Sequence, residues 1–166
     1  YVNIDDVNRL IADAADDPRS LTAQVMKKPF SVVLIDEIEK AHPNVLTALL
    51  QVLDEGILRD IKNREVSFRD TIIIATSNAG ADKIREIVER GYDISKYEDS
   101  IVNNLISTNQ FRPEFLNRFD EITIFKPLSE SDLLQIVDLM IAGVNKTLAS
   151  QKIKVSIMDD AKRILV

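Results

Sequence analysis

Ser31-Val32-Val33-Leu34-Ile35-Asp36-Glu37 is a run of β-branched and aliphatic residues that ends in two acids. An apolar run without polar alternation is typical of a strand that is buried on both faces of a parallel sheet. A second run of this kind, Thr71 to Thr76, is followed by Ser77-Asn78. Helical patterns lie between and around the two runs, so the sequence predicts an α/β fold with a parallel sheet.

Apolar spacing, capping residues and turn residues predict the other elements. Up to Pro127 we expect five helices, over residues 4–14, 18–27, 43–56, 82–90 and 96–108, of which the third has His42 as a structural cap. We also expect a hairpin over 57–68 and a strand over 121–125. After Pro127 we expect a long helix capped by Ser129, whose apolar stripe from Leu133 to Leu148 forms a core, then a strand over 152–157 and a helix capped by Asp159. The change of pattern predicts a large part over residues 1–127 and a small second domain over 128–166.

Composition excludes several classes of protein. The chain has 166 residues, a net charge of −6 and no cysteine, which removes disulfides, thiolate metal sites and a cysteine nucleophile. The acidic balance argues against binding nucleic acid without regard to sequence, which requires a basic face. The apolar runs are far shorter than the roughly 20 residues that cross a bilayer. We therefore expect a cytoplasmic protein with neither a membrane nor a nucleic acid as partner.

The polar residues that follow the two strands can support phosphate chemistry. In an open parallel sheet, ligands bind just beyond the carboxyl ends of the strands, where Asp36, Glu37 and Asn78 fall. An Asp there can position Mg²⁺ through its water shell, and a neighbouring Glu can orient the water that attacks a γ-phosphate. Asn78 can hold that water or a phosphate oxygen. Taken singly, the acid pair and Asn78 are each better explained as residues of a solvated turn.

Two arginines, Arg112 and Arg118, stand six residues apart before the expected strand over 121–125. Each can form an ion pair with a local carboxylate, which is the default interpretation. Alternatively, an arginine here can project from one subunit and neutralise the charge that develops on a phosphoryl group in the next subunit.

Together and in this order, these segments resemble the second ATPase module of the Clp-type AAA+ ATPases. The matching segments are Val32–Pro43, Leu49–Gly56, Thr76–Asn78 and Phe111–Arg118. The resemblance implies an incomplete AAA+ core, a P-loop NTPase fold with a parallel sheet, over residues 1–127 and the start of a small α+β lid domain over 128–166.

The resemblance also implies ATP and Mg²⁺ as cofactors and gives each site residue a role. Asp36 would serve Mg²⁺ through water and, with Asn78, contact the nucleotide. Glu37 would be the catalytic base, and Asn78 the sensor of the γ-phosphate. Arg118 would be the arginine finger that reaches a neighbouring subunit, whereas Arg112 would support its loop or the subunit contact.

The activity implied by the resemblance is that of a ring, expected to be a homohexamer, which uses ATP hydrolysis to pull unfolded or misfolded proteins through a pore. Such rings deliver proteins to a Clp-type peptidase or rescue aggregates, and the sequence leaves peptidase docking open. Two other functions stay open. One is an AAA+ ATPase that remodels another target, such as a clamp loader or transcription activator, and the segment 111–118 argues against it. The other is a non-hydrolysing structural or adaptor protein with the AAA+ fold.

The sequence departs from the family in its phosphate loop. That loop, Gly-x-x-x-x-Gly-Lys-Ser/Thr, is missing, because none of the four glycines precedes Lys-Ser or Lys-Thr. We expect it upstream of Tyr1 in the natural protein, and we expect the isolated chain to lack ATPase activity. The Gly-Ala-Arg sensor of the small domain is likewise expected beyond Val166.

A second departure concerns the grip on substrate. Where relatives carry an aromatic in a glycine-rich pore loop, residues 12–20 of this chain are acidic and contain no aromatic residue. The candidate substrate contacts are therefore Asp16, Asp17 and Arg19 in this segment and Lys62, Asn63 and Arg64 at the hairpin tip, where relatives have a second pore loop. A solvated turn explains the hairpin tip equally well.

Overall fold

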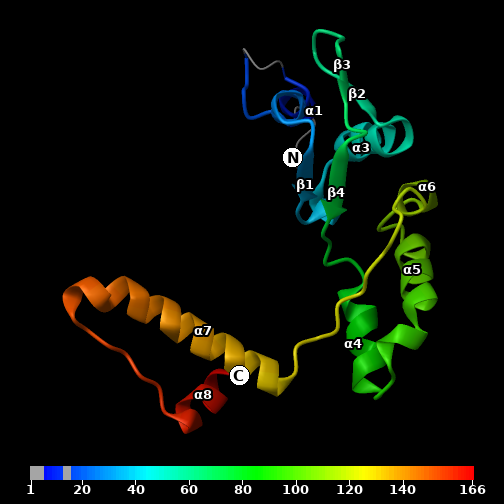
Figure 1. The fold of residues 1–166 in the computed structure, drawn as a ribbon. Helices are drawn as coiled ribbons and strands as arrows, with labels where there is room; N and C mark the ends of the chain where they lie inside the picture. The colour runs from blue at the N-terminus through cyan, green and yellow to red at the C-terminus, as the bar shows by residue number, and fades with distance from the viewer. Residues whose placement is uncertain (1–5, 13–15) are drawn as a thin grey trace. The chain divides into compact units, whose positions relative to one another are not determined.

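The computed structural model describes residues 6–12 and 16–166, and the chain divides into two compact units (Figure 1). The first unit is Tyr1–Ile124 and the second is Phe125–Val166. Each unit is described by itself below.

A two-stranded parallel sheet lies at the centre of the first unit. Strand β1 (Ser31–Ile35) pairs with β4 (Thr71–Ala75), in register from Ser31 opposite Thr71 to Ile35 opposite Ala75. The predicted α/β fold with a parallel sheet is confirmed. The prediction that the strands are buried on both faces is wrong for one face, where four alternating side chains are exposed: Val32 (61%), Leu34 (64%), Ile72 (63%) and Ile74 (46%). Side chains of a strand alternate between faces, and in this unit only the face of Val33, Ile35, Ile73 and Ala75 packs on the core.

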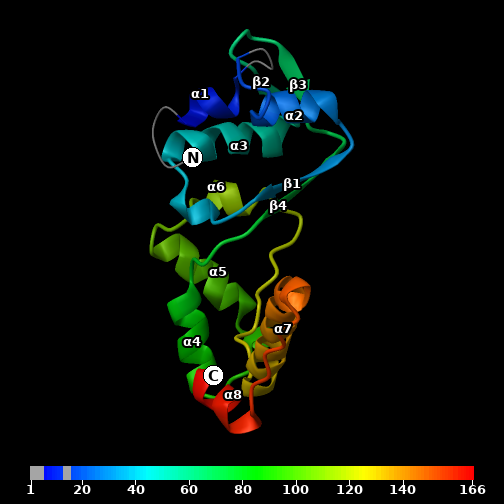
Figure 2. The same ribbon diagram turned by 90° about the vertical axis from the view of Figure 1, so that its left-hand side faces the viewer.

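Helix α3 (Pro43–Glu55) connects the acid-bearing loop to the hairpin (Figure 2). It begins after His42, whose Nδ1 accepts a hydrogen bond from the Asn44 amide at 3.2 Å, so the predicted structural role of this histidine is confirmed. Val45, Leu49 and Val52 form its buried face. The helix ends at Gly56, which adopts a left-handed conformation with φ of 67°.

The predicted hairpin is also confirmed. Strands β2 (Ile57–Arg59) and β3 (Glu65–Ser67) pair in antiparallel fashion, with Leu58 opposite Val66 and both side chains buried. The tip therefore comprises residues 60–64, as the charged segment of the sequence indicated.

The helices before β1 are shorter than expected. Helix α1 spans Asp6–Leu10, and the predicted parts of this helix at residues 4–5 and 13–14 lie outside the described residues. Helix α2 spans Leu21–Lys27 and does not open at Pro18. The reason is local: the Ser20 hydroxyl accepts a hydrogen bond from the Ala23 amide at 3.2 Å, and this cap sets the start of the helix.

A second apolar cluster lies among α4 (Ala81–Glu89), the 3₁₀ turn η2 (Ile94–Lys96) and α5 (Glu98–Ser107), which follow β4. Ile87, Ile94 and Ile101 form the cluster, and Ile124 packs against it. The next helix, α6 (Pro113–Leu116), packs Phe115 and Leu116 into the main core instead. The strand predicted over 121–125 is absent from the described structure, because this segment packs Ile124 against the helices and forms no ladder with β1 or β4.

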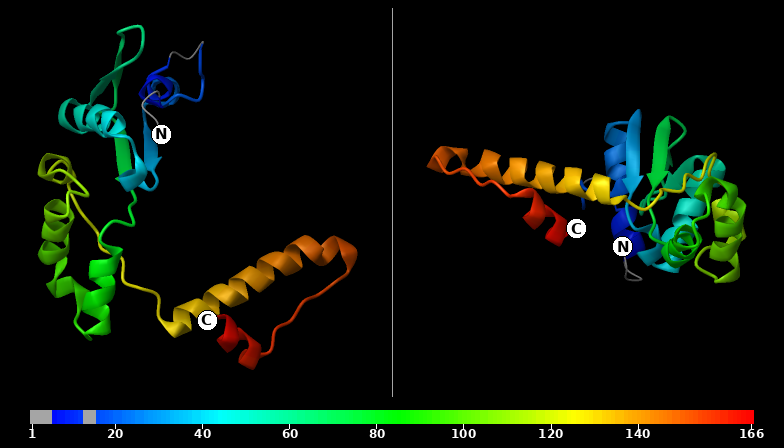
Figure 3. Two further views of the ribbon diagram at one scale, coloured as in Figure 1. Left: turned by 180° about the vertical axis from the view of Figure 1, so that it is seen from behind. Right: turned by 90° about the horizontal axis from the view of Figure 1, so that it is seen from below.

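The second unit contains α7 (Glu130–Leu148), the 3₁₀ turn η3 (Ala149–Gln151) and α8 (Asp159–Leu165). Ser129 caps α7 as predicted and forms a capping box with Asp132. The strand predicted over 152–157 is wrong, because the side-chain amide of Asn145 holds the backbone of Val155: Val155 N donates to Oδ1 at 2.7 Å and Nδ2 donates to the Val155 carbonyl at 2.8 Å. Figure 3 shows this segment running back along α7.

Two further predictions for the second unit are wrong. Asp159 is the first residue of α8, and Met158 is its cap, without a capping hydrogen bond from its side chain. The apolar stripe of α7 forms no buried core in the described structure: Met140 is 66% exposed and Val144 45%, and no residue of the helix is buried. In this unit, α8 and the segment of residues 152–157 lie alongside α7 and cover little of it, so most side chains of the stripe stay exposed to solvent. By length and composition alone, residues Glu130–Gln151, with a mean hydropathy of 1.2, could cross a membrane.

Candidate functional site

The residues predicted to act on phosphate meet at one edge of the sheet. Asp36 and Glu37 follow β1, and Thr76, Ser77 and Asn78 follow β4. The two strand ends are tied by backbone hydrogen bonds from Thr76 N to the Ile35 carbonyl at 2.9 Å and from Ile38 N to the Thr76 carbonyl at 3.0 Å. The structure thus brings Asp36, Glu37 and Asn78 together, although about 40 residues of sequence separate them.

Thr76 organises the acid pair. Its hydroxyl donates to Asp36 Oδ1 and accepts a hydrogen bond from the Glu37 amide at 3.1 Å. One side chain therefore fixes both the carboxylate of Asp36 and the backbone of Glu37. The sequence analysis gave Thr76 no role, although a hydroxyl at the end of a strand beside two acids was a usable signal.

Glu37 is held in an uncommon backbone conformation. Its φ of 53° and ψ of 51° are left-handed, which costs a non-glycine residue on the order of 1–3 kcal/mol and occurs often at functional sites. This turn aims its carboxylate at the end of β4, where Oε1 lies 3.5 Å from Asn78 Nδ2. The predicted base and the predicted sensor are therefore side by side.

The ammonium group of Lys40 places a positive charge at this site. Its Nζ lies 2.6 Å from Glu37 Oε1, and both side chains are partly exposed. This hydrogen bond from Lys40 to Glu37 raises the pKa of Lys40; desolvation opposes the change, and the nearby charges of Glu37, Glu39 and Asp36 add to it. Lys40 is therefore a fixed positive charge next to the predicted base.

Glu39 connects the acid loop to the Asn78 loop. Its Oε1 accepts a hydrogen bond from the Asn78 backbone amide at 3.2 Å, whereas its Oε2 is buried without a partner in the described structure. Burial by itself would raise the pKa of Glu39, but hydrogen bonds from the Ser77 side chain and from the backbone amides of Glu39 and Asn78 outweigh it and leave the pKa below its ordinary value. Glu39 is thus an ionised positioning residue for Asn78, which the sequence analysis missed.

A pocket opens directly beside the acid pair. It is lined by the following residues from α1, β1, the acid loop and α3: Leu10, Leu34, Ile35, Asp36, Glu37, Ile38, Lys40, Ala41, Val45 and Leu49. Asp36 is exposed at this edge. Among the described residues, no group of three or more acids or histidines could hold a metal ion. An exposed carboxylate such as that of Asp36 fits a cation that takes few protein ligands and keeps its water ligands, as Mg²⁺ does.

Arg118 lies apart from the acid pair. It forms an ion pair with Asp54, and the two side chains are 47% and 33% exposed. Asp54 is in the last turn of α3, whereas the acid loop precedes its first turn. Since a helix of 13 residues is about 20 Å long, the structure does not bring Arg118 to Glu37 of the same chain. Arg112 lies 3.7 Å from Glu114 in an exposed ion pair.

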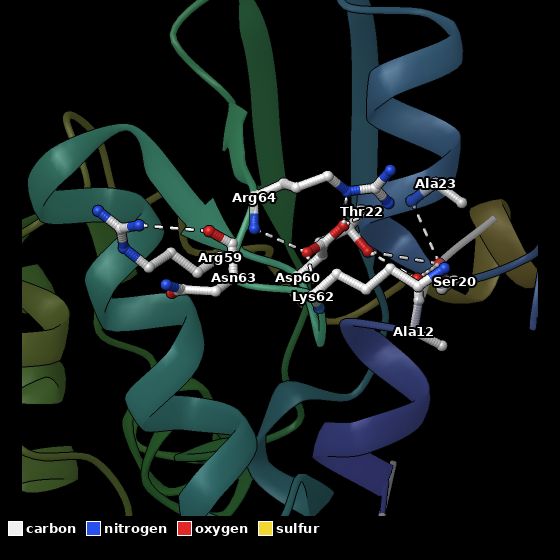
Figure 4. Close-up of polar contacts among 9 residues, drawn as sticks. All are labelled: Ala12, Ser20, Thr22, Ala23, Arg59, Asp60, Lys62, Asn63 and Arg64. Carbon is white, nitrogen blue, oxygen red and sulfur yellow. Dashed lines mark hydrogen bonds and ion pairs between the residues drawn. The ribbon is translucent and has the colours of Figure 1, made fainter.

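The candidate substrate contacts lie in two segments, and Figure 4 shows those of the hairpin tip together with Ala12 and Ser20, the ends of the acidic segment. Lys62, Asn63 and Arg64 form the hairpin tip, and the Ile61 amide donates to the Ile11 carbonyl at 2.9 Å, so the tip is attached to the segment after α1. In the acidic segment, the backbone amide of Arg19 donates to Asp17 at 2.9 Å. This hydrogen bond lowers the pKa of Asp17.

Comparisons with known proteins cover almost all of the chain. The family model "AAA domain (Cdc48 subfamily)" matches residues 5–122, and the model of the C-terminal, D2-small domain of ClpB protein matches residues 128–166.

Three curated relatives are 45–49% identical to the chain. They are the ATP-dependent Clp protease ATP-binding subunit ClpE of Streptococcus pneumoniae (48% over 151 residues, 91% of this chain and 20% of the relative), chaperone protein ClpB of Tropheryma whipplei (49% over 145 residues, 87% and 20%) and the ATP-dependent Clp protease ATP-binding subunit ClpC of Staphylococcus saprophyticus (45% over 154 residues, 89% and 18%). The chain therefore spans about a fifth of the length of these relatives.

A solved structure has a similar fold. It is a closed state of Hsp104 with ATPγS and FITC casein, and it matches with a TM-score of 0.63 and 38% sequence identity over 75% of this chain and 21% of that chain.

Proposed function

This chain belongs to the Clp-type AAA+ ATPases, as the motifs of its sequence indicated, and we propose that it supplies the hydrolytic residues of a longer, ATP-driven protein unfoldase. In this proposal, residues 1–127 are part of the large AAA+ subdomain and residues 128–166 part of the small lid subdomain. The observation that carries the proposal is the meeting of Asp36, Glu37 and Asn78 at one sheet edge, with Asn78 Nδ2 3.5 Å from Glu37 Oε1.

The proposal gives a separate task to each residue. Asp36, fixed by the Thr76 hydroxyl, would hold Mg²⁺ through its water shell, and the ion would supply positive charge to the phosphate oxygens. Glu37 accepts the proton of the attacking water. Asn78, held by Glu39 through its backbone amide, places its side-chain amide beside that water and the terminal phosphate.

Arg118 is proposed to act on the site of a neighbouring subunit. Its location near the last turn of α3, away from the acid pair of its own chain, supports this role. A finger that acts between subunits requires a ring, and we propose a homo-oligomer, expected to be hexameric. Its substrates are proposed to be unfolded or misfolded proteins, because one solved relative was captured with FITC casein.

Two further parts of the proposal rest on the names of the relatives. Two of them are ATP-binding subunits of a protease and one is a chaperone, so both delivery to a Clp-type peptidase and rescue of aggregates are compatible with the family. A cytoplasmic location is proposed on the same ground. The match of residues 128–166 to a small AAA+ domain supports a helix that packs on protein, not one that spans a membrane.

The decisive experiment uses the full-length natural protein with Glu37→Gln. We expect ATP hydrolysis to fall by about 10²-fold or more, because the amide cannot accept the proton of water, while ATP binding measured by calorimetry persists. The matched control is Glu89→Gln, an exposed acid at the end of α4, which should keep the wild-type rate. Hydrolysis at the wild-type rate by Glu37→Gln would refute the site.

The isolated chain of 166 residues gives a second test. It contains no Gly-x-x-x-x-Gly-Lys-Ser/Thr sequence, so we propose that it binds ATP weakly and hydrolyses none. Tight ATP binding by this chain in calorimetry would contradict the proposal and would favour a different nucleotide site.

A further inference from the structure

Asp60 is a buried carboxylate at the base of the hairpin tip. Its side chain is only 1% exposed. Oδ1 accepts hydrogen bonds from the backbone amides of Lys62 and Arg64, both at 2.9 Å, and Oδ2 accepts from Arg64 Nε at 2.7 Å. Arg64 Nη2 lies 2.6 Å from the same Oδ2. The tip is therefore wrapped around one carboxylate (Figure 4).

Backbone hydrogen bonds close the tip around this carboxylate. The Asp60 amide donates to the Arg64 carbonyl at 3.0 Å, and the Asn63 amide donates to the Asp60 carbonyl at 2.9 Å. Asn63 takes the left-handed conformation that this tight turn requires, with φ of 60°. The five residues 60–64 thus form a closed turn whose interior is the carboxylate of Asp60.

This closed turn is fastened to the acidic segment. The Ile61 amide donates to the Ile11 carbonyl at 2.9 Å. On the next residue, the Ala12 carbonyl accepts hydrogen bonds from the hydroxyls of Ser20 at 2.7 Å and Thr22 at 3.1 Å, and both of these side chains are fully buried. The two ends of the acidic segment, at Ala12 and Ser20, are therefore joined to each other and, through Ile11, to the hairpin tip.

Burial of a charge this completely is favourable only when the charge is well paired. Burial alone would raise the pKa of Asp60, but the hydrogen bonds from Arg64 and Lys62 and the charge of Arg64 outweigh it and hold the pKa below its ordinary value. Asp60 is consequently ionised at neutral pH. The guanidinium of Arg64, a candidate substrate contact by sequence, is engaged by Asp60.

We propose that Asp60 is a positioning residue that holds the hairpin tip against Ile11, so that the tip and the described ends of the acidic segment, at Ala12 and Ser20, form one contact surface. This inference rests on the proposed function, in which these loops contact the substrate polypeptide. Asp60 itself does not contact the substrate. It acts through the backbone of residues 61–64, and the surface that it presents to a polypeptide contains Lys62 and Asn63.

The test is Asp60→Asn in the full-length natural protein, with fluorescent casein as the substrate probe. The amide keeps the size of the side chain but loses the charge that pairs with Arg64. We expect the casein concentration for half-maximal stimulation of ATP hydrolysis to rise about 3- to 10-fold, with the rate at saturating casein unchanged. A lower rate at saturation with the same half-maximal concentration would overturn the proposal, since it would show a general structural defect.

Amide hydrogen exchange on the same variant separates this inference from the proposed function. Asp60→Asn should speed exchange at Lys62 and Arg64, which donate to Asp60, and also at Ile61, which donates to Ile11. Faster exchange at the first two amides with Ile61 unchanged would refute the coupling of the two loops. This result does not depend on hydrolysis, so it stands even if Glu37→Gln shows that the hydrolytic site is elsewhere.

The matched control is Glu65→Gln. Glu65 is on the same hairpin, but its side chain is 56% exposed and pairs with Arg59 on the neighbouring strand. This variant should leave both the half-maximal casein concentration and the exchange of residues 61–64 at their wild-type values. An effect equal to that of Asp60→Asn would show that any loss of charge on the hairpin suffices, and it would overturn the role of Asp60.

Discussion

We predict that any side chain at Gly56, the residue between α3 and the hairpin, lowers the stability of the first unit. Its φ of 67° is a left-handed conformation that costs an L-residue about 1–2 kcal/mol. A Cβ at this position would also lie 2.7 Å from Cγ of Arg69, which would have to move. Because Cγ is close to the Arg69 backbone and not at the far end of the side chain, the Arg69 side chain must change rotamer to relieve the clash, and Gly56→Ala should destabilise the first unit by at least about 1–2 kcal/mol.

Urea unfolding followed by circular dichroism measures this loss. We expect a lower midpoint at an unchanged slope, and a melting temperature lower by about 3–10 °C. Gly143→Ala is the matched control: Gly143 lies within α7, and a Cβ there meets no atom within 4 Å. This substitution should stabilise the second unit by about 0.8–1 kcal/mol through helix propensity.

A double variant separates the two causes. Adding Arg69→Ala to Gly56→Ala removes the close contact but not the left-handed conformation, so a loss of about 1–2 kcal/mol should persist. Full recovery of stability in the double variant would refute the backbone argument, and no loss in Gly56→Ala would refute both causes.

Two other predictions concern the candidate site. If Arg118 acts between subunits, rings assembled from a mixture of Glu37→Gln and Arg118→Ala chains should hydrolyse ATP although each variant alone is inactive; a mixture as inactive as the single variants would contradict this role. Glu39 has a lower pKa in the folded than in the unfolded chain, so its ionised form stabilises the fold fully above its ordinary pKa of 4.5, and this contribution disappears as the pH falls through the folded value. The urea concentration at half unfolding should therefore fall less steeply with decreasing pH in Glu39→Gln than in the wild type. An equally steep fall would show that Glu39 does not contribute to the acid sensitivity of the fold.

Sequence patterns predicted the parts of the fold that local residues determine. The apolar runs ending at Ile35 and Ala75 predicted β1 and β4 because β-branched residues favour a strand wherever a partner strand is present. The strand predicted over 152–157 failed because the Asn145 amide captures the backbone of Val155, ten residues away in sequence. A polar side chain that takes the place of a strand partner leaves no periodic signal.

In the candidate site, too, the residues that local sequence determines could be predicted, whereas those that depend on distant contacts could not. Asp36, Glu37 and Asn78 could be predicted because strand ends and a family motif placed them. Thr76 gave only the signal of a hydroxyl at a strand end, and Glu39 gave none, since their roles depend on the left-handed turn at Glu37 and on hydrogen bonds across about 40 residues of sequence.

Helix α3 explains why the site and the substrate loops belong to one mechanical unit. Its first turn follows the acid loop and is fixed by the His42 cap, while its last turn holds Arg118 through Asp54 and leads through Gly56 into the hairpin. Its buried face of Val45, Leu49 and Val52 belongs to the main core of the unit, as do Leu58 and Val66 of the hairpin. A packed helix moves as a rigid body because its interior contacts leave no room for internal adjustment. A displacement at the acid loop would therefore reach Arg118 and the hairpin together, whereas a break in α3 would uncouple the acid loop from both.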